Sequence, residues 1–235
     1  MTIQNREKFL NHLAERLNQP RHQLADHPYQ QVNDLPQQTL KDKTAAELFS
    51  LAKKNSEALP VSFYETTLAD LPKLLTDYIE KSGGGPVLLP TSERFNDFNL
   101  TTWQKEIAAN QAVTYWRPDA SREENLKVAE TANISISFAD FLLAESGTIT
   151  VSSSPGQGRA LHFLPTHYLS IVPRSRIVPR STQAVAWYEK ERAAGRLDSS
   201  AIHFITGPSN SGDIEMQLVT GVHGPLDVAY VVVND

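Results

Sequence analysis

The feature that most constrains the fold is the regular alternation of helix-like and strand-like segments between residues 44 and 133. Apolar residues at three- and four-residue spacing predict helices, and the short apolar runs between them predict buried strands. The predicted helices span 44–58, 67–81, 99–109 and 121–132, and the predicted strands span 61–64, 87–89 and 112–116. Because such alternation is typical of a sheet covered by helices on both faces, we predict an α/β fold with a mainly parallel sheet.

After residue 133 the pattern changes to short apolar runs separated by turn residues, which predicts a β-rich insert. Its expected strands lie at 134–138, 141–144, 148–152 and 168–172. A helix over 181–194, a strand over 202–205, a glycine-bearing loop, a short helix with Ile214 and Leu218 on its inner face, and a strand over 228–233 are expected to complete the domain.

The first 38 residues differ from the rest of the chain. Residues 3–17 predict an amphipathic helix, and residues 19–38 carry three prolines among polar residues, which indicates an extended connector. We therefore divide the chain into an N-terminal helix and polar linker at 1–38 and an α/β domain at 39–235.

Composition excludes several classes of function. The chain contains no cysteine, so it has no thiol nucleophile, thiolate zinc site or all-cysteine iron–sulfur cluster of its own. Its seven histidines form no H-E-x-x-H pair, and we predict no metal site. A net charge of −5 argues against general nucleic-acid binding. No signal-peptide-like core or run of about 18 apolar residues occurs, so we expect a cytoplasmic protein without a transmembrane segment.

The loop over residues 206–215 is the first candidate ligand site, because it leaves a strand and enters the predicted short helix. Such loops lie at the carboxyl edge of an open sheet, and free N–H groups at a helix N-terminus favour anions. The Lys-Ser/Thr pair of a nucleotide-binding phosphate loop is missing. Simple helix capping is the alternative. The predicted anion-binding residues are Gly207, Ser209, Asn210, Ser211, Gly212 and Asp213.

Two other turns carry the candidate catalytic groups. His223 lies between Gly221 and Gly224, where it is either an anion-binding or proton-transferring group or a plain loop residue. A helix between this turn and the Ser209 loop would separate them by about 15 Å, so we expect no shared small anion and allow His223 a role at a homodimer interface. Glu145 is either a base or carboxylate nucleophile or a solvated turn residue, and its neighbours Ser146, Gly147 and Thr148 are further candidate ligand-binding residues.

Residues 146–188 contain four arginines and no acid. The planar guanidinium of arginine matches the oxygens of carboxylates and phosphates, so we expect Arg159, Arg174 or Arg176 to face the anion bound by the Ser209 loop. The alternative is that strand-rich segments are simply poor in acidic residues.

Four motifs together resemble the lactate-utilisation protein C family, the LutC/YkgG group of LUD-domain proteins. They are Ala-Glu-Ser-Gly-Thr-Ile at 144–149, Leu-Pro-Thr-His at 164–167, Thr-Gly-Pro-Ser with Asp-Ile-Glu at 206–215, and Gly-Val-His-Gly-Pro at 221–225. The family often has Asp-Thr-Gly-Thr where this chain has residues 145–148, and Ser-Arg-Thr-Ala-Asp where it has residues 209–213.

The resemblance implies a Rossmann-like sheet related to the ribose-phosphate isomerase and CoA-transferase-like superfamily. It also implies a part in oxidising L-lactate to pyruvate beside iron–sulfur proteins, with the clusters in those partners and none in this chain. We therefore expect a component of a quinone- or cytochrome-type L-lactate dehydrogenase system that binds a small organic or phosphorylated anion. The alternatives are a stand-alone enzyme that uses Glu145 or His223 on an acyl or phosphorylated substrate, and a metabolite-sensing scaffold.

Overall fold

The structure is a computed structural model that describes residues 4–22, 25, 30–214 and 217–235. The chain divides into two units, Met1–Gln38 and Thr39–Asp235. The first unit contains helices α1 (Arg6–Leu17) and α2 (Leu35–Gln38). The expected helix at 3–17 thus begins at Arg6, and residue 3 lies outside the described part. No helix among the described residues has the length and apolarity needed to cross a membrane.

The centre of the second unit is a six-stranded sheet in which every pair of neighbouring strands is parallel, in the order β1-β12-β7-β4-β2-β3. The prediction of an α/β fold with a mainly parallel sheet is therefore confirmed. The strands are β1 (Ser62–Thr67), β2 (Val87–Pro90), β3 (Val113–Trp116), β4 (Ile134–Phe138), β7 (His167–Pro173) and β12 (Asp227–Asn234).

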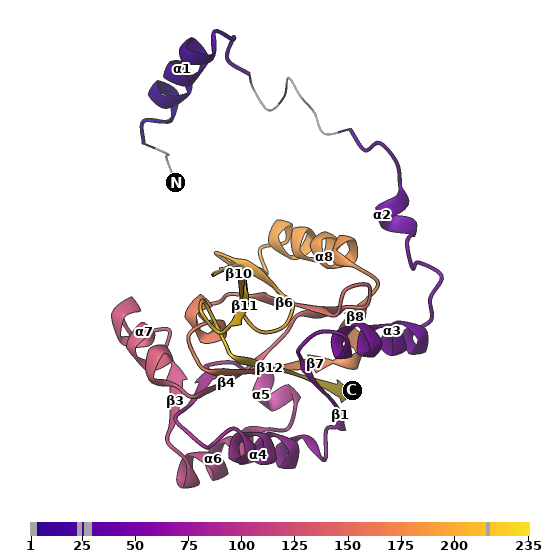
Figure 1. Ribbon diagram of the computed structural model, residues 1–235, viewed down its shortest axis with the longest axis vertical. Coiled ribbons are helices and arrows are strands. Elements are labelled where there is room, and N and C mark those ends of the chain that lie inside the picture. The colour runs from indigo at the N-terminus through magenta and orange to yellow at the C-terminus, as the bar shows by residue number, and fades with distance from the viewer. Residues whose placement is uncertain (1–3, 23–24, 26–29, 215–216) are drawn as a thin grey trace. The chain divides into compact units, whose positions relative to one another are not determined.

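Helices cover one face of this sheet, as Figure 1 shows. Helices α4 (Leu71–Lys81), α5 (Arg94–Asp97) and α6 (Thr101–Asn110) pack their apolar residues on that face, where they meet Ile136 and Val231. The opposite face carries α3 (Ala45–Glu57), α7 (Arg122–Thr131) and a second sheet.

The second sheet has four strands in the order β8-β5-β6-β9. They are β5 (Phe141–Leu143), β6 (Thr148–Ser152), β8 (Ile177–Val178) and β9 (Ile202–Ile205). Helix α8 (Ser181–Ala193) packs on its outer side through Ala184 and Tyr188. The β-rich insert is thus smaller than expected, because residues 134–138 and 168–172 form β4 and β7 of the main sheet, where burial on both faces requires apolar or small side chains.

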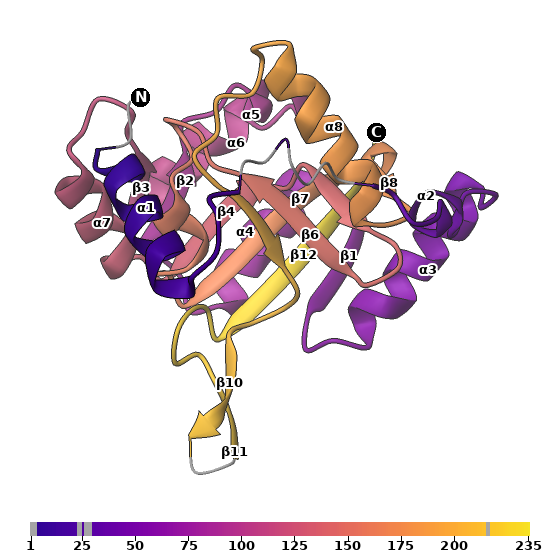
Figure 2. The ribbon, with the colours of Figure 1, turned by 90° about the horizontal axis from the view of Figure 1, so that it is seen from above.

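The segment after β9 corrects a second expectation. The short helix predicted around Ile214 and Leu218 is an antiparallel hairpin of β10 (Asn210–Ile214) and β11 (Gln217–Thr220). Gly212 and the β-branched pair Val219–Thr220 disfavour a helix, and so short a helix has little stability without strong packing. Figure 2 shows this hairpin beside the end of the sheet where β12 begins.

Candidate functional site

The carboxyl edge of the main sheet holds a cleft of about 440 Å³, lined by loops that follow β1, β2, β4, β7 and β12. Ligands bind at this edge in open parallel sheets, because several loops converge there around a sheet whose strand order reverses. The reversal lies between β2 and β4, since β3 and β4 flank β2 on opposite sides. Polar groups of the cleft come from Arg94, Asp97, Asp140, Ser175, Arg176 and Asp235.

Arg94 bridges the point where the strand order reverses. It begins α5 after β2, and its Nη2 donates to the carbonyl oxygen of Ala139, which follows β4, at 2.8 Å. Its Nη1 lies 3.6 Å from Asp140 Oδ1, and the guanidinium lies 4.9 Å from the centre of the Phe138 ring. Burial lowers the pKa of Arg94, the Asp140 carboxylate opposes this shift, and nearby Arg176 adds to it. The charge of Arg94 is therefore partly desolvated and favours an additional anionic partner.

Arg176 supplies the second cation of the cleft. It ends the 3₁₀-helix η3 (Arg174–Arg176) that follows β7, and its guanidinium lies 5.3 Å from the centre of the Phe141 ring and 5.1 Å from that of Trp187. Among the described residues it makes no salt bridge within 4 Å. The aromatic rings fix the guanidinium while its N–H groups remain available to a ligand.

Two of the three aspartates that line the cleft, Asp140 and Asp235, are engaged by other groups. Asp140 Oδ2 accepts hydrogen bonds from the Ser152 N–H at 2.7 Å and the Tyr188 hydroxyl at 2.9 Å, while Oδ1 faces Arg94. Asp235 accepts hydrogen bonds from the N–H and the hydroxyl of Ser175. Arg94 already donates to Ala139 and faces Asp140, so the guanidinium of Arg176 is the main donor left for a carboxylate ligand among the described residues of the cleft.

The Ser209 loop lies at the opposite, amino edge of the same sheet. Its Ser209 N–H donates to the Pro225 carbonyl at 3.1 Å, and the Leu226 N–H donates to the Thr166 carbonyl at 2.9 Å, just before β12 and β7 begin. The expectation that this loop lies at the carboxyl edge is wrong, because the preceding strand β9 belongs to the second sheet and not to the main one.

Backbone groups of Gly207 and Ser209 in this loop are already hydrogen-bonded within the protein. The Gly207 N–H donates to the Tyr230 hydroxyl at 3.1 Å, and the Gly221 N–H donates to the Ser209 carbonyl at 2.8 Å. The other candidates, Asn210, Ser211, Gly212 and Asp213, belong to β10 of the hairpin rather than to a helix N-terminus. Since no helix begins here, the structural basis expected for anion binding is missing from this loop.

His223 lies close to the loop, contrary to the separation of about 15 Å expected for a connecting helix. Its N–H donates to Ser209 Oγ at 3.3 Å, because the hairpin brings its two ends together. Both residues line a pocket of about 310 Å³ with Gly207 and Gly224. A role of His223 at a dimer interface stays a prediction.

The turn at residues 145–148 joins β5 and β6, as expected for a hairpin. Glu145 Oε2 accepts from Arg180 Nε at 2.9 Å, and Asn55 Nδ2 of α3 donates to the Glu145 carbonyl at 2.9 Å. A Cβ on Gly147 would lie 2.7 Å from the Ser56 backbone nitrogen, so the turn packs tightly against α3. These contacts give the turn a structural role, while catalysis by Glu145 and ligand binding by Ser146, Gly147 and Thr148 stay predictions.

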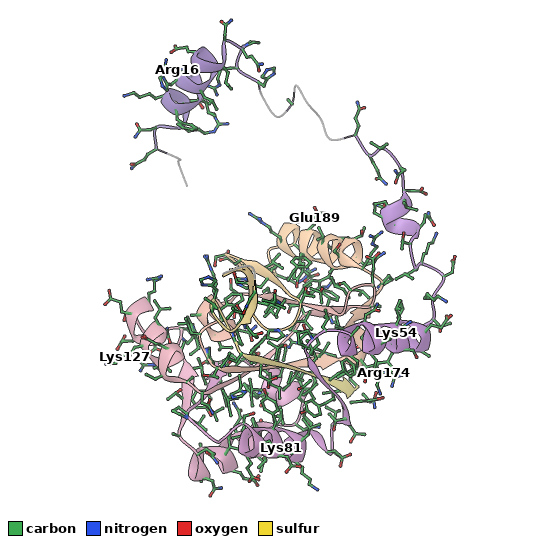
Figure 3. All side chains as sticks on the ribbon, in the orientation of Figure 1. Arg16, Lys54, Lys81, Lys127, Arg174 and Glu189 are labelled. Carbon is green, nitrogen blue, oxygen red and sulfur yellow. The ribbon has the colours of Figure 1, made fainter. Side chains whose placement is uncertain are left out.

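The structure does not bring the three candidate arginines together. Arg159 begins the 3₁₀-helix η2 (Arg159–His162), and its Nη2 donates to Ser200 Oγ at 3.1 Å, within a separate groove of about 760 Å³. Arg174 donates to Asn234 Oδ1 at 2.8 Å and covers the Phe49 ring at 4.0 Å; Figure 3 labels it beside α3. Arg176 alone of the three lines the carboxyl-edge cleft.

Sequence reasoning missed three residues that the structure makes prominent. Arg94 and Asp140 each follow a buried strand, and that position is a general signal for the carboxyl edge of a parallel sheet. His162 was considered only as one of the seven histidines that form no zinc motif, and no local pattern in the sequence indicates its burial. No group of three or more potential metal ligands occurs among the residues that the structure describes.

Comparison with known proteins identifies close relatives. The family model described as the LUD domain matches residues 49–233. The lactate utilization protein C of Geobacillus kaustophilus (strain HTA426) is 43% identical over 99% of this chain and 98% of its own length. That of Bacillus subtilis (strain 168) is 39% identical over 100% of this chain and 98% of its own length.

A solved structure supports the fold. The crystal structure of a DUF162 family protein from Deinococcus radiodurans covers 82% of this chain and 99% of that one, with a TM-score of 0.59 and 18% sequence identity. At this level of identity, the comparison supports the arrangement of strands and helices.

Proposed function

Since the chain belongs to the LUD-domain family, we propose that it serves lactate utilisation in the cytoplasm as the cluster-free component of an L-lactate-oxidising system. In this proposal it binds a small organic carboxylate in the carboxyl-edge cleft and works with iron–sulfur proteins. The name of its relatives, lactate utilization protein C, supports the metabolic assignment. The lack of cysteine supports placing the clusters in the partners.

The observation that carries the ligand assignment is the pair of guanidiniums of Arg94 and Arg176 in one cleft. Lactate and pyruvate each carry one carboxylate, and a planar guanidinium can donate to both oxygens of a carboxylate. Arg94 is buried, and the nearby charge of Arg176 lowers its pKa further, so an anion between the two guanidiniums offsets their repulsion.

The role proposed for this chain is to bind and orient the carboxylate substrate. Oxidation of L-lactate to pyruvate removes two electrons and two protons from the substrate, and the electrons require a carrier. In the proposal, iron–sulfur partners accept the electrons, while Arg176 and Arg94 hold the carboxylate. The aromatic surface of Phe98 and Trp187 in the same cleft excludes water from one side of the ligand.

Titration calorimetry with pyruvate and L-lactate at low ionic strength tests the binding site. We expect Arg176→Ala to weaken binding by about tenfold or more, because a charge-assisted hydrogen bond is lost. Arg174→Ala is the matched control, since Arg174 lies two residues away on the same 3₁₀-helix but pairs with Glu65 and Asn234. Equal affinity of the wild type and Arg176→Ala for these ligands would show that the cleft is not the binding site.

A further inference from the structure

The pocket at the amino edge of the main sheet is distinct from the cleft assigned above. It has a volume of about 310 Å³, and its lining residues include Ser209, next to the base of the β10–β11 hairpin, and Val228 of β12. Figure 2 shows the ribbon of this hairpin. Its walls come from η2, from the loop after β9 and from the turn before β12. Its lining includes the ring side chains of His162, Phe163, Phe204, Pro208 and Pro225.

The observation that points to a ligand is His162. Its side chain is 1% exposed and lines the pocket, yet neither ring nitrogen has a hydrogen-bond partner among the described residues. Buried polar groups are nearly always hydrogen-bonded, because an unsatisfied one costs about 1–3 kcal/mol. Neighbouring rings surround it without satisfying it, with Phe163 at 6.0 Å and Tyr168 at 5.5 Å between ring centres.

His162 is neutral in this environment. Burial lowers its pKa to about 3, and the adjacent His203 acts in the same direction. A neutral imidazole presents one N–H donor and one acceptor nitrogen. It therefore suits an uncharged ligand that offers a hydrogen-bond acceptor, a hydrogen-bond donor, or both.

The rest of the pocket disfavours an anion. Among the residues that the structure describes, none of those lining it is Lys, Arg, Asp or Glu. The N–H groups of Gly207, Ser209 and His223 already donate within the protein, to Tyr230, Pro225 and Ser209 respectively. An anion there would lose its hydration without gaining a cation or a set of free donors.

We propose that the amino-edge pocket binds an uncharged planar ring compound with a carbonyl or amide group that hydrogen-bonds to His162. The rings of Phe163 and Phe204 supply flat apolar contact for the ligand, and the Ser209 hydroxyl supplies a second polar contact. This chemistry is shared by carboxamide-bearing aromatic rings and by quinone and flavin rings. The site adds a second ligand to the chain and does not depend on carboxylate binding by Arg176.

Nicotinamide and nicotinate form a matched pair of probes, because they have nearly the same shape and differ in charge at neutral pH. The experiment follows the side-chain nitrogen resonances of His162 and the amide resonances of Ser209 and Gly224 by NMR during titration of the full chain. We expect nicotinamide to shift these resonances with a dissociation constant on the order of a millimolar, as suits so small a ligand. We expect nicotinate to bind about tenfold more weakly.

Two variants locate the binding. His162→Phe keeps a ring but removes both nitrogens, so nicotinamide affinity should fall about fivefold to tenfold. His203→Phe is the control, because His203 lies 5.7 Å from the His162 ring but does not line the pocket. The proposal is overturned if nicotinamide leaves the wild-type resonances unchanged, if nicotinate binds as tightly, or if His162→Phe binds nicotinamide like the wild type. Should that variant fail to fold, the two wild-type titrations decide the question alone.

Discussion

The N–H of His223 donates to the hydroxyl oxygen of Ser209 across a distance of 3.3 Å and joins two turns that lie 14 residues apart in the sequence. This bond closes the base of the β10–β11 hairpin, together with the bond from the Gly221 N–H to the Ser209 carbonyl. The glycine-bearing motifs at 206–209 and 221–225 therefore form one structural unit at the amino edge of the sheet.

Removal of the Ser209 hydroxyl tests this unit. We expect Ser209→Ala to destabilise the protein by about 1 kcal/mol, because the His223 N–H loses its acceptor. For a domain of this size that change corresponds to a melting temperature lower by about 2–4 °C. Ser50→Ala is the control, since Ser50 is an exposed residue of α3 whose hydroxyl bonds only to the Ala46 carbonyl. An unchanged melting temperature in Ser209→Ala would show that the bond does not hold the hairpin.

The turn at Gly147 offers a second test, on packing rather than hydrogen bonding. Gly147 and Gly195 both have positive φ, at 66° and 71°, but a Cβ on Gly147 would lie 2.7 Å from the Ser56 nitrogen, whereas Gly195 faces open space. We expect Gly195→Ala to cost about 1 kcal/mol from backbone strain alone. Gly147→Ala should cost about 2 kcal/mol more, because α3 must shift. Urea unfolding measures both, and equal losses would contradict tight packing of the turn on α3.

The buried His162 makes a prediction about pH. Its pKa in the folded chain is lowered to about 3, whereas an unfolded histidine titrates near about 6.5. Between these values the unfolded chain binds a proton that the folded chain excludes, so the free energy of unfolding decreases as the pH falls through about 6.5 toward 3. Burial also lowers the pKa of His203, which adds to the same trend.

Urea unfolding at pH 7.5 and pH 5 measures this dependence. We expect the free energy of unfolding to fall less from pH 7.5 to pH 5 in His162→Phe than in the wild type. The variant lacks a histidine that takes up a proton in the unfolded chain but not in the folded one. His12→Gln changes an exposed histidine of α1 and serves as the comparison. The same pH dependence in wild type and His162→Phe would mean that His162 takes up its proton in the folded chain.

Local signals in the sequence predicted much of the fold. Ser121 followed three residues later by Glu124 is the sequence pattern of a helix capping box, and in the structure the Ser121 N–H donates to Glu124 Oε2 at 2.8 Å and the Glu124 N–H to Ser121 Oγ at 3.2 Å. Likewise, α8 ends at Ala193, two residues before Gly195, which has positive φ. Such features depend on residues within one turn of each other, so the chain needs no long-range information to specify them.

The main wrong prediction concerned the position of the Ser209 loop, which depends on strand pairing between residues far apart in the sequence. Whether β9 joins the main sheet or the second one decides at which edge the Ser209 loop lies, and β9 pairs with β6, about fifty residues earlier. The hairpin at 210–220 was mistaken for a helix because Gly221 ends either structure equally well. Arg94 escaped notice because α5 is only four residues long and gives no periodic signal. The candidate site therefore shifted from the loop at 206–213 to the cleft at the other edge, with Arg176 as the shared residue.

The most direct test of the proposed function is L-lactate-dependent reduction of an artificial electron acceptor, measured with the purified chain alone and with the iron–sulfur proteins that co-purify with it from lactate-grown cells. We predict no turnover by the chain alone, turnover by the reconstituted mixture, and a loss of about tenfold in kcat/KM when the chain carries Arg176→Ala but not Arg174→Ala. Robust lactate oxidation by the chain alone would contradict the account, as would a mixture whose activity does not depend on this chain.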